Sequence, residues 1–167
     1  MKESVDNVRV NKRSLTLQDY NIEEFDNAKT KVLKYILFKK RTEKEVRQKF
    51  SSSLDENLLD DVIENLKENG YLDDQNYIER AVKEFLAIKT MSIKEMKNKL
   101  YTKGLESDMI ETYFSYHEEE LKEYEIACAK KIIAKKQPQM EQEEIEAFLY
   151  KKGYSKESVR MAEEDMN

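Results

Sequence analysis

The residue types that most often carry catalysis are scarce in this chain of 167 residues. His117 is its only histidine and Cys128 its only cysteine. A histidine-based catalytic triad or a His/Cys metal cluster needs more of these side chains than one chain supplies here. The carboxylates at Asp73-Asp74 and Glu118 to Glu120 fit helix caps and solvated faces better than a divalent-ion site. We therefore expect no enzyme activity, no bound metal and no cofactor.

Lysine and arginine side chains are the stronger candidates for function, because they can bind phosphates or acidic protein surfaces. Between Lys29 and Lys49, basic residues greatly outnumber the acidic Glu43 and Glu45. A solvated face without a partner is the alternative for each basic residue. The candidate partner-binding or DNA-binding residues are Lys39, Lys40, Arg41, Arg47, Lys97, Lys99 and Lys103.

The segments that hold these side chains follow a repeated pattern. Residues 92–110 match a later segment when Gly104 is aligned with Gly153, and the apolar positions then coincide. They match an earlier segment more weakly when Ser92 is aligned with Thr42. That earlier copy lacks the glycine and one further residue. The chain therefore contains one structural unit in three copies.

Each copy predicts two helices joined by a tight turn. Ser92 with Glu95, and Thr42 with Glu45, form the capping-box pattern of a helix start. Gly104 supplies the left-handed residue that ends the helix, and the next apolar residue packs back across the turn. Three glycines are predicted to be structural joints of this kind: Gly70, Gly104 and Gly153.

The composition favours an all-helical fold. With only three glycines and one proline, the turn residues of a sheet-rich protein are nearly absent. Charged and apolar residues each make up 39% of the chain, which suits thin helical units better than one thick globule. We predict an all-α fold, an elongated, curved array of three tandem three-helix repeats with nine helices.

The predicted boundaries follow the apolar periodicity. Residues 1–25 carry little of it and are expected to form a loosely packed arm. Three repeats follow, over residues 26–73, 74–118 and 119–167. The first helices of the repeats carry Tyr35, Tyr77 and Tyr124, which we expect in the core rather than as base-stacking platforms. The helices with predicted bounds cover about residues 27–40, 42–50, 57–69, 106–116, 121–136, 141–152 and 155–165.

Charge and cysteine content limit the setting in which the protein works. The formal net charge is −5 and the isoelectric point is near 5.2, so no general basic field attracts the chain to nucleic acid. A single cysteine forms no intramolecular disulfide, and no signal peptide or membrane-spanning run is evident. We expect a cytoplasmic monomer whose DNA binding, if it occurs without a partner, is weak and local.

Four motifs in order give the chain a resemblance to the RecX family. The family's Arg-Ser-Glu-x-Glu-Leu-x-x-Lys-Leu is matched over Arg41–Phe50, and its Gly-Tyr-Leu-Asp-Asp stands unaltered at Gly70–Asp74. Its Lys-Gly-Ile joint is similar to 103–105, and its closing Arg-Gly-Phe to 152–154. The likeness covers about residues 26–165. The chain departs from the family at Ser92, where a glycine is usual, at the first joint and in the N-terminal segment.

The resemblance implies a non-enzymatic regulator of the RecA recombinase. Members of the family lie along the groove of the RecA filament on DNA and slow filament extension, ATP hydrolysis and strand exchange. The resemblance therefore implies a role in recombination, DNA repair and the SOS response. Two alternatives remain open from the residues alone: a helical protein that binds DNA directly, and a helical scaffold for another protein.

Overall fold

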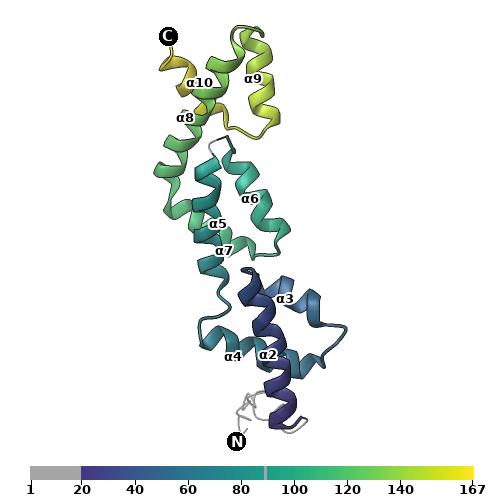
Figure 1. Ribbon diagram of the computed structural model, residues 1–167. Coiled ribbons are helices and arrows are strands. Elements are labelled where there is room, and N and C mark those ends of the chain that lie inside the picture. Colours follow the sequence, from purple (N-terminus) through teal and green to yellow (C-terminus); the bar gives the residue numbers. More distant parts are fainter. Residues whose placement is uncertain (1–19, 89) are drawn as a thin grey trace, which may run out of the picture. The chain divides into compact units, whose positions relative to one another are not determined.

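The computed structural model describes residues 20–88 and 90–167, and it confirms the all-helical fold (Figure 1). The described residues contain nine helices and no strand. In chain order the helices are α2 (Ile22–Phe38), α3 (Glu43–Phe50), α4 (Glu56–Glu68), α5 (Asp74–Ile88), α6 (Ile93–Thr102), α7 (Ser107–Tyr116), α8 (Glu118–Lys136), α9 (Gln142–Lys151) and α10 (Lys156–Glu164).

The helices belong to two compact units. The first unit comprises the described part of Met1–Arg41 together with Val46–Leu72. The second unit comprises Thr42–Glu45 and Asp73–Asn167. The first turn of α3 therefore belongs to the second unit, whereas the rest of α3 contributes to the first.

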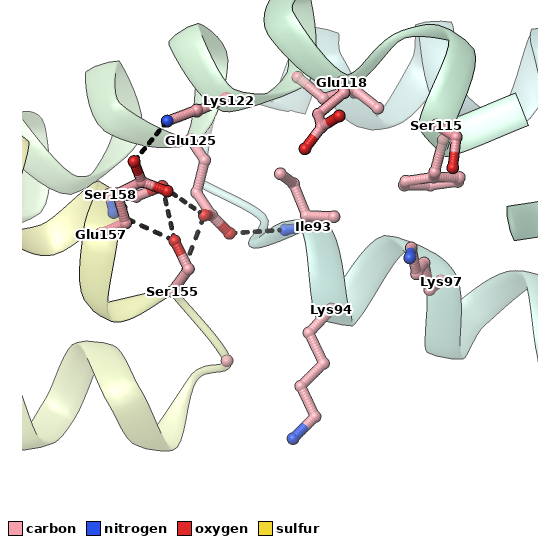
Figure 2. A pocket seen from close by; sticks show the side chains of 13 residues that line it. Ile93, Lys94, Lys97, Ser115, Glu118, Lys122, Glu125, Ser155, Glu157 and Ser158 are labelled. Carbon is pink, nitrogen blue, oxygen red and sulfur yellow. Dashed lines mark hydrogen bonds and ion pairs between the residues drawn. The ribbon is translucent and has the colours of Figure 1, made fainter.

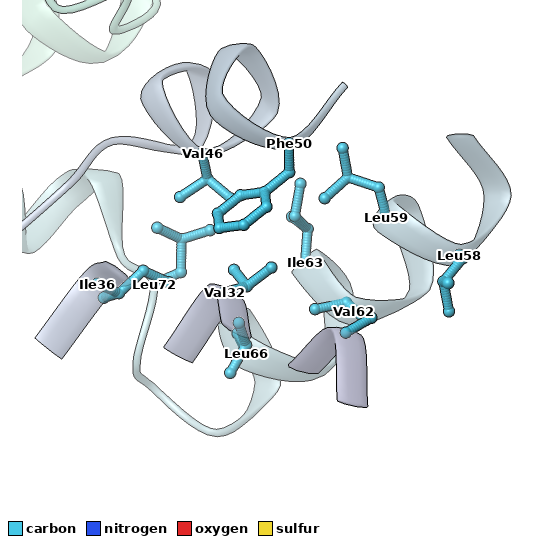
Figure 3. Close-up of a cluster of buried hydrophobic side chains, with 11 residues drawn as sticks. Val32, Ile36, Val46, Phe50, Leu58, Leu59, Val62, Ile63, Leu66 and Leu72 are labelled. Carbon is cyan, nitrogen blue, oxygen red and sulfur yellow. The ribbon is translucent and has the colours of Figure 1, made fainter. Parts of the chain in front are cut away.

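The core of the first unit is formed by α2, α4 and the C-terminal part of α3 (Figure 3). Helix α2 buries Ala28, Val32 and Ile36, which are four residues apart and so share one face. The Tyr35 ring meets the Phe50 ring edge-on, with 5.6 Å between their centroids. Tyr35 thus packs against the core, as the sequence predicts.

The start of α2 differs from the sequence prediction. The helix begins at Ile22 rather than near residue 27, because Asn21 and Glu24 form a complete capping box. Tyr20 and Phe25 pack against the core of the first unit, and their stacked rings lie 6.3 Å apart. Residues 20–25, which we expected in the arm, are therefore part of this unit. The remainder of the expected arm, residues 1–19, lies outside the described residues.

The second unit has two hydrophobic clusters, and α8 contributes to both. Leu121 belongs to the cluster of α5, α6 and α7, whereas Ile133 belongs to the cluster of α9 and α10. Helix α8 begins at Glu118 and not near residue 121, so Glu118–Glu120 form its first turn instead of a join. Carboxylates at this position stabilise the positive end of the helix dipole.

Two buried hydroxyl groups connect segments about sixty residues apart within the second unit. Thr42 Oγ1 donates a hydrogen bond to the carbonyl of Lys103 over 2.7 Å, and Ser92 Oγ donates to the carbonyl of Lys152 over 2.8 Å. Both hydroxyls also accept a backbone N–H in their capping boxes. We call these two places the Thr42 junction and the Ser92 junction.

Gly153, the joint glycine of the Ser92 junction, has a left-handed backbone conformation, and its neighbours leave no room for a side chain. Its φ is 94°, and a Cβ at Gly153 would lie 2.9 Å from Ser92 Oγ and 3.0 Å from Lys94 Cβ. Gly70 has a similar φ of 73° but no atom within 4 Å of such a Cβ. The two glycines therefore separate the effect of conformation from the effect of contact.

We predict that Gly153→Ala destabilises the chain more than Gly70→Ala. Both substitutions place an alanine in the left-handed region, at about 1 kcal/mol each, and Gly153→Ala must also displace the Ser92 junction. We expect a total loss of about 2 kcal/mol or more for Gly153→Ala, measured by urea denaturation. Equal losses for the two variants would show that the contact at Gly153 does not matter.

Candidate partner-binding surfaces

The basic residues predicted for the first unit have different surroundings. Lys39 and Lys40 follow α2 and are exposed. Arg41 lies over the Tyr35 ring, with its Cζ 4.4 Å from the ring centroid. Arg47 forms an ion pair with Asp60 of α4. Only the first two therefore point into solvent, while the two arginines pack against their own unit.

The predicted basic residues of the second unit are also held unequally. Lys97 donates to Glu111 over 2.7 Å and lies 5.3 Å from the centroid of the Phe114 ring. Lys103 pairs with Glu45 over 2.9 Å. Lys99 is exposed on α6. Lys97 and Lys103 thus bind different carboxylates, and the local sequence around each lysine does not reveal these partners.

A pocket of about 500 Å³ lies in the second unit beside the Ser92 junction (Figure 2). Its lining combines apolar side chains with lysines, glutamates and serines. A rim ion pair joins Lys122 of α8 to Glu157 of α10 over 2.7 Å. The lining residues are Ile93, Lys94, Lys97, Phe114, Ser115, Glu118, Leu121, Lys122, Glu125, Gly153, Ser155, Glu157 and Ser158.

The carboxylate of Glu125 is the central polar group of this pocket, although only 1% of the residue is exposed. It accepts hydrogen bonds from the Ile93 backbone N–H over 3.0 Å and from the Ser158 hydroxyl over 2.7 Å. The Ser155 backbone N–H is a third donor, at 3.4 Å (Figure 2). Because these donors come from three segments, the carboxylate holds α6, α8 and the start of α10 together.

Glu125 is not among the residues predicted from the sequence, although the repeat contains a signal for it. At the Thr42 junction, the carboxylate of Asp74 accepts the backbone N–H of Glu43 over 3.0 Å. Glu125 does the same for Ile93, the residue that follows the other cap. Each junction therefore has an acidic residue that binds the first free amide of a helix.

A second cleft, of about 410 Å³, lies between α6 and the C-terminal end of α9. Three of its seven lining residues are lysines, and none of these three is among the site residues predicted from the sequence. Lys94 borders both hollows, and its side chain extends away from Glu125 in Figure 2. The lining residues are Lys94, Glu95, Asn98, Phe148, Lys151, Lys152 and Gly153.

Reactive groups contribute little to these surfaces. Among the described residues, no group of three or more His, Cys, Asp and Glu side chains is arranged to hold a metal ion. Burial raises the pKa of the Cys128 thiol, so it stays protonated and is a poor nucleophile. No helix in the described part of the chain has the length and apolar character needed to cross a membrane.

Comparison with known proteins identifies the family. The chain is 30% identical over 154 residues to Regulatory protein RecX of Staphylococcus haemolyticus, which covers 88% of this chain and 58% of that protein. It is 29% identical over 154 residues to Regulatory protein RecX of Streptococcus mutans, covering 86% and 57%. The chain belongs to the RecX family. This RecX-family chain spans just over half the length of these curated relatives.

Solved RecX structures share the fold. RecX from Lactobacillus salivarius superimposes with a TM-score of 0.75 at 21% identity, over 87% of this chain and 97% of that one. A second regulatory protein RecX gives a TM-score of 0.71 at 18% identity, over 96% and 80%. No protein-family model matches the chain. The helical arrangement of the RecX family is therefore retained at low sequence identity.

We predict that Glu125→Gln destabilises the second unit by about 1 to 3 kcal/mol, because one amide NH₂ would face buried N–H and O–H donors. The control is Glu123→Gln on the same helix, where the side chain is exposed and the expected change is below about 0.5 kcal/mol. Urea denaturation measures both variants. A Glu125→Gln variant as stable as the control would contradict the role given to this carboxylate.

Proposed function

We propose that this RecX-family chain is a regulatory protein that binds the RecA filament on DNA and slows its ATP hydrolysis, extension and strand exchange. The observation that carries the proposal is the 30% identity over 154 residues to a Regulatory protein RecX. The resemblance of the junction motifs to those of the RecX family supports the same function. We further propose a cytoplasmic monomer that acts in recombination, DNA repair and the SOS response.

The segment at the end of α2 is the first contact that we propose. Phe38 is 88% exposed and Leu37 is 66% exposed, so two large apolar side chains stand in solvent. Lys39 and Lys40 follow them directly and are also exposed. An apolar pair flanked by two cations suits a protein surface that combines apolar and acidic groups. We call residues 37–40 the α2 end segment.

The other predicted basic residues have supporting roles in this proposal. Arg41, Arg47, Lys97 and Lys103 each have an interaction within the chain, so their charges are partly used in holding its helices. Lys99 remains an exposed candidate on α6. Gly70, Gly104 and Gly153 act as joints and do not contact the partner.

The three repeats, at residues 26–73, 74–118 and 119–167, are proposed to be the binding modules. Several modules on one chain can engage neighbouring subunits of a polymer, and their weak contacts then combine through a high effective concentration. Such a binder affects filament extension and ATP hydrolysis without any catalytic group of its own.

A titration of RecA ATPase activity tests the proposal. We expect that adding the chain to RecA on single-stranded DNA lowers the rate of ATP hydrolysis in a saturable manner, because the bound chain restricts filament growth. A coupled ATPase assay measures the rate. Unchanged hydrolysis and strand exchange at saturating chain would rule out this function.

The charge-reversal variant Lys39→Glu/Lys40→Glu tests the α2 end segment in the same assay. We expect about tenfold more of this variant to be needed for half-maximal inhibition, because two attractive contacts become repulsive. The matched control is Lys131→Glu/Lys135→Glu, two exposed lysines of α8 with the same change in charge. Arg41 is left unchanged because it packs on Tyr35. Equal inhibition by both variants would exclude the segment from the contact.

The two alternative functions give different results. A protein that binds DNA directly would bind a strand tightly without RecA, and its affinity would fall steeply with salt. A scaffold for another protein would leave RecA activity unchanged. The ATPase titration therefore tests the scaffold alternative, and a DNA-binding measurement without RecA at several salt concentrations tests the direct DNA binder.

A further inference from the structure

The second cleft, between α6 and α9, has an excess of positive charge that the fold does not use. Lys94, Lys151 and Lys152 line it, and among the residues that the structure describes Glu95 is the only acidic one in the lining. One oxygen of Glu95 already accepts the Ser92 backbone N–H over 2.8 Å. Within the described residues, none of the three lysines forms an ion pair with a carboxylate.

The Phe148 ring holds further positive charge at this place. Lys136 Nζ lies 4.0 Å from the ring centroid, and Lys152 Nζ lies 5.5 Å from it. An aromatic face attracts cations through its quadrupole, so Phe148 attracts both ammonium groups without neutralising their charge. The cleft therefore has three lysines in its lining, and a fourth, Lys136, contacts its aromatic residue.

The Thr42 junction carries less unpaired positive charge, although the repeat relates the two places. Lys103 corresponds to Lys152, but it is neutralised by Glu45 over 2.9 Å. The position of Lys151 is occupied there by Thr102, which is uncharged. Lys44, the counterpart of Lys94, also forms no ion pair with a carboxylate among the described residues. The Ser92 junction therefore exceeds the Thr42 junction by two unpaired lysines, Lys151 and Lys152, which the architecture of the repeat does not require.

We infer that the α6–α9 cleft binds the phosphate backbone of single-stranded nucleic acid. All its cations are lysines, which act as point charges on phosphates, whereas paired recognition of a protein carboxylate favours the planar fork of arginine. A basic groove with an aromatic side chain is typical of binding to single strands. The inference goes beyond the proposed function, because the cleft binds the strand without RecA.

The test is the affinity of the full chain for fluorescein-labelled oligothymidylate, measured by fluorescence anisotropy at several salt concentrations. The cleft variant is Lys94→Gln/Lys151→Gln, and the matched control is Lys131→Gln/Lys135→Gln. We expect about tenfold weaker binding by the cleft variant at low salt, and a log–log salt slope smaller by about 1. The control should bind within about twofold of the unchanged chain. Far-ultraviolet circular dichroism verifies that both variants are folded.

Three results would overturn the inference. The first is that the unchanged chain does not bind the strand at low salt, and the second is that the two variants lose equal affinity for it. The third is that a polyglutamate peptide binds as tightly as the oligonucleotide and loses the same affinity in the cleft variant. The last result would assign the cleft to an acidic protein segment. The RecA titration is separate. If the unchanged chain inhibits RecA but does not bind the strand, the inference fails and the proposed function stands.

Discussion

The structure of the second unit depends on a hydroxyl group buried at the start of a helix. Ser92 Oγ accepts the Glu95 N–H over 3.1 Å and donates to the Lys152 carbonyl over 2.8 Å. The first bond satisfies an amide that a helix start leaves free, and the second satisfies a carbonyl that a helix end leaves free. One side chain thus joins two helix ends that are sixty residues apart in sequence. Thr42 does the same for Lys103.

The position of the Ser92 hydroxyl restricts which residues can lie around it. The joint glycine must lack a side chain because Ser92 and Lys94 occupy the adjacent space. Glu125 must be acidic because it accepts the amide of the residue after the cap. With the backbone groups satisfied in this way, the lysines around the junction are not needed for stability. Their number can therefore change from one junction to the other, which gives closely related junctions different surfaces.

The sequence predicts local features well. The capping boxes at Thr42 and Ser92 and the left-handed glycines depend on residues a few positions apart, so their pattern can be read directly. The capping box of Asn21 and Glu24 is equally local, but it was not predicted because the surrounding segment contains few apolar residues. Glu118–Glu120 were misassigned because a run of like charges resembles a linker as much as a first helical turn.

The surfaces could not be predicted in the same way. Nothing near Lys103 shows that Glu45 neutralises it, and nothing near Glu125 shows that Ile93 donates to it, since both partners are distant in sequence. The RecX family usually has a glycine at the position of Ser92, so the resemblance did not predict the hydrogen bond from the Ser92 hydroxyl to the Lys152 carbonyl. Long-range pairing therefore separates the lysines that stabilise the fold from those left for a partner.

The stability of Ser92→Ala relative to Ser92→Thr tests the central role of this hydroxyl most directly. Urea denaturation should show a loss of about 2 kcal/mol for alanine, which leaves the Lys152 carbonyl and the Glu95 amide without their partner. Threonine should retain most of the stability, because Thr42 makes the same two bonds at the other junction. An alanine variant as stable as the unchanged chain would contradict the account.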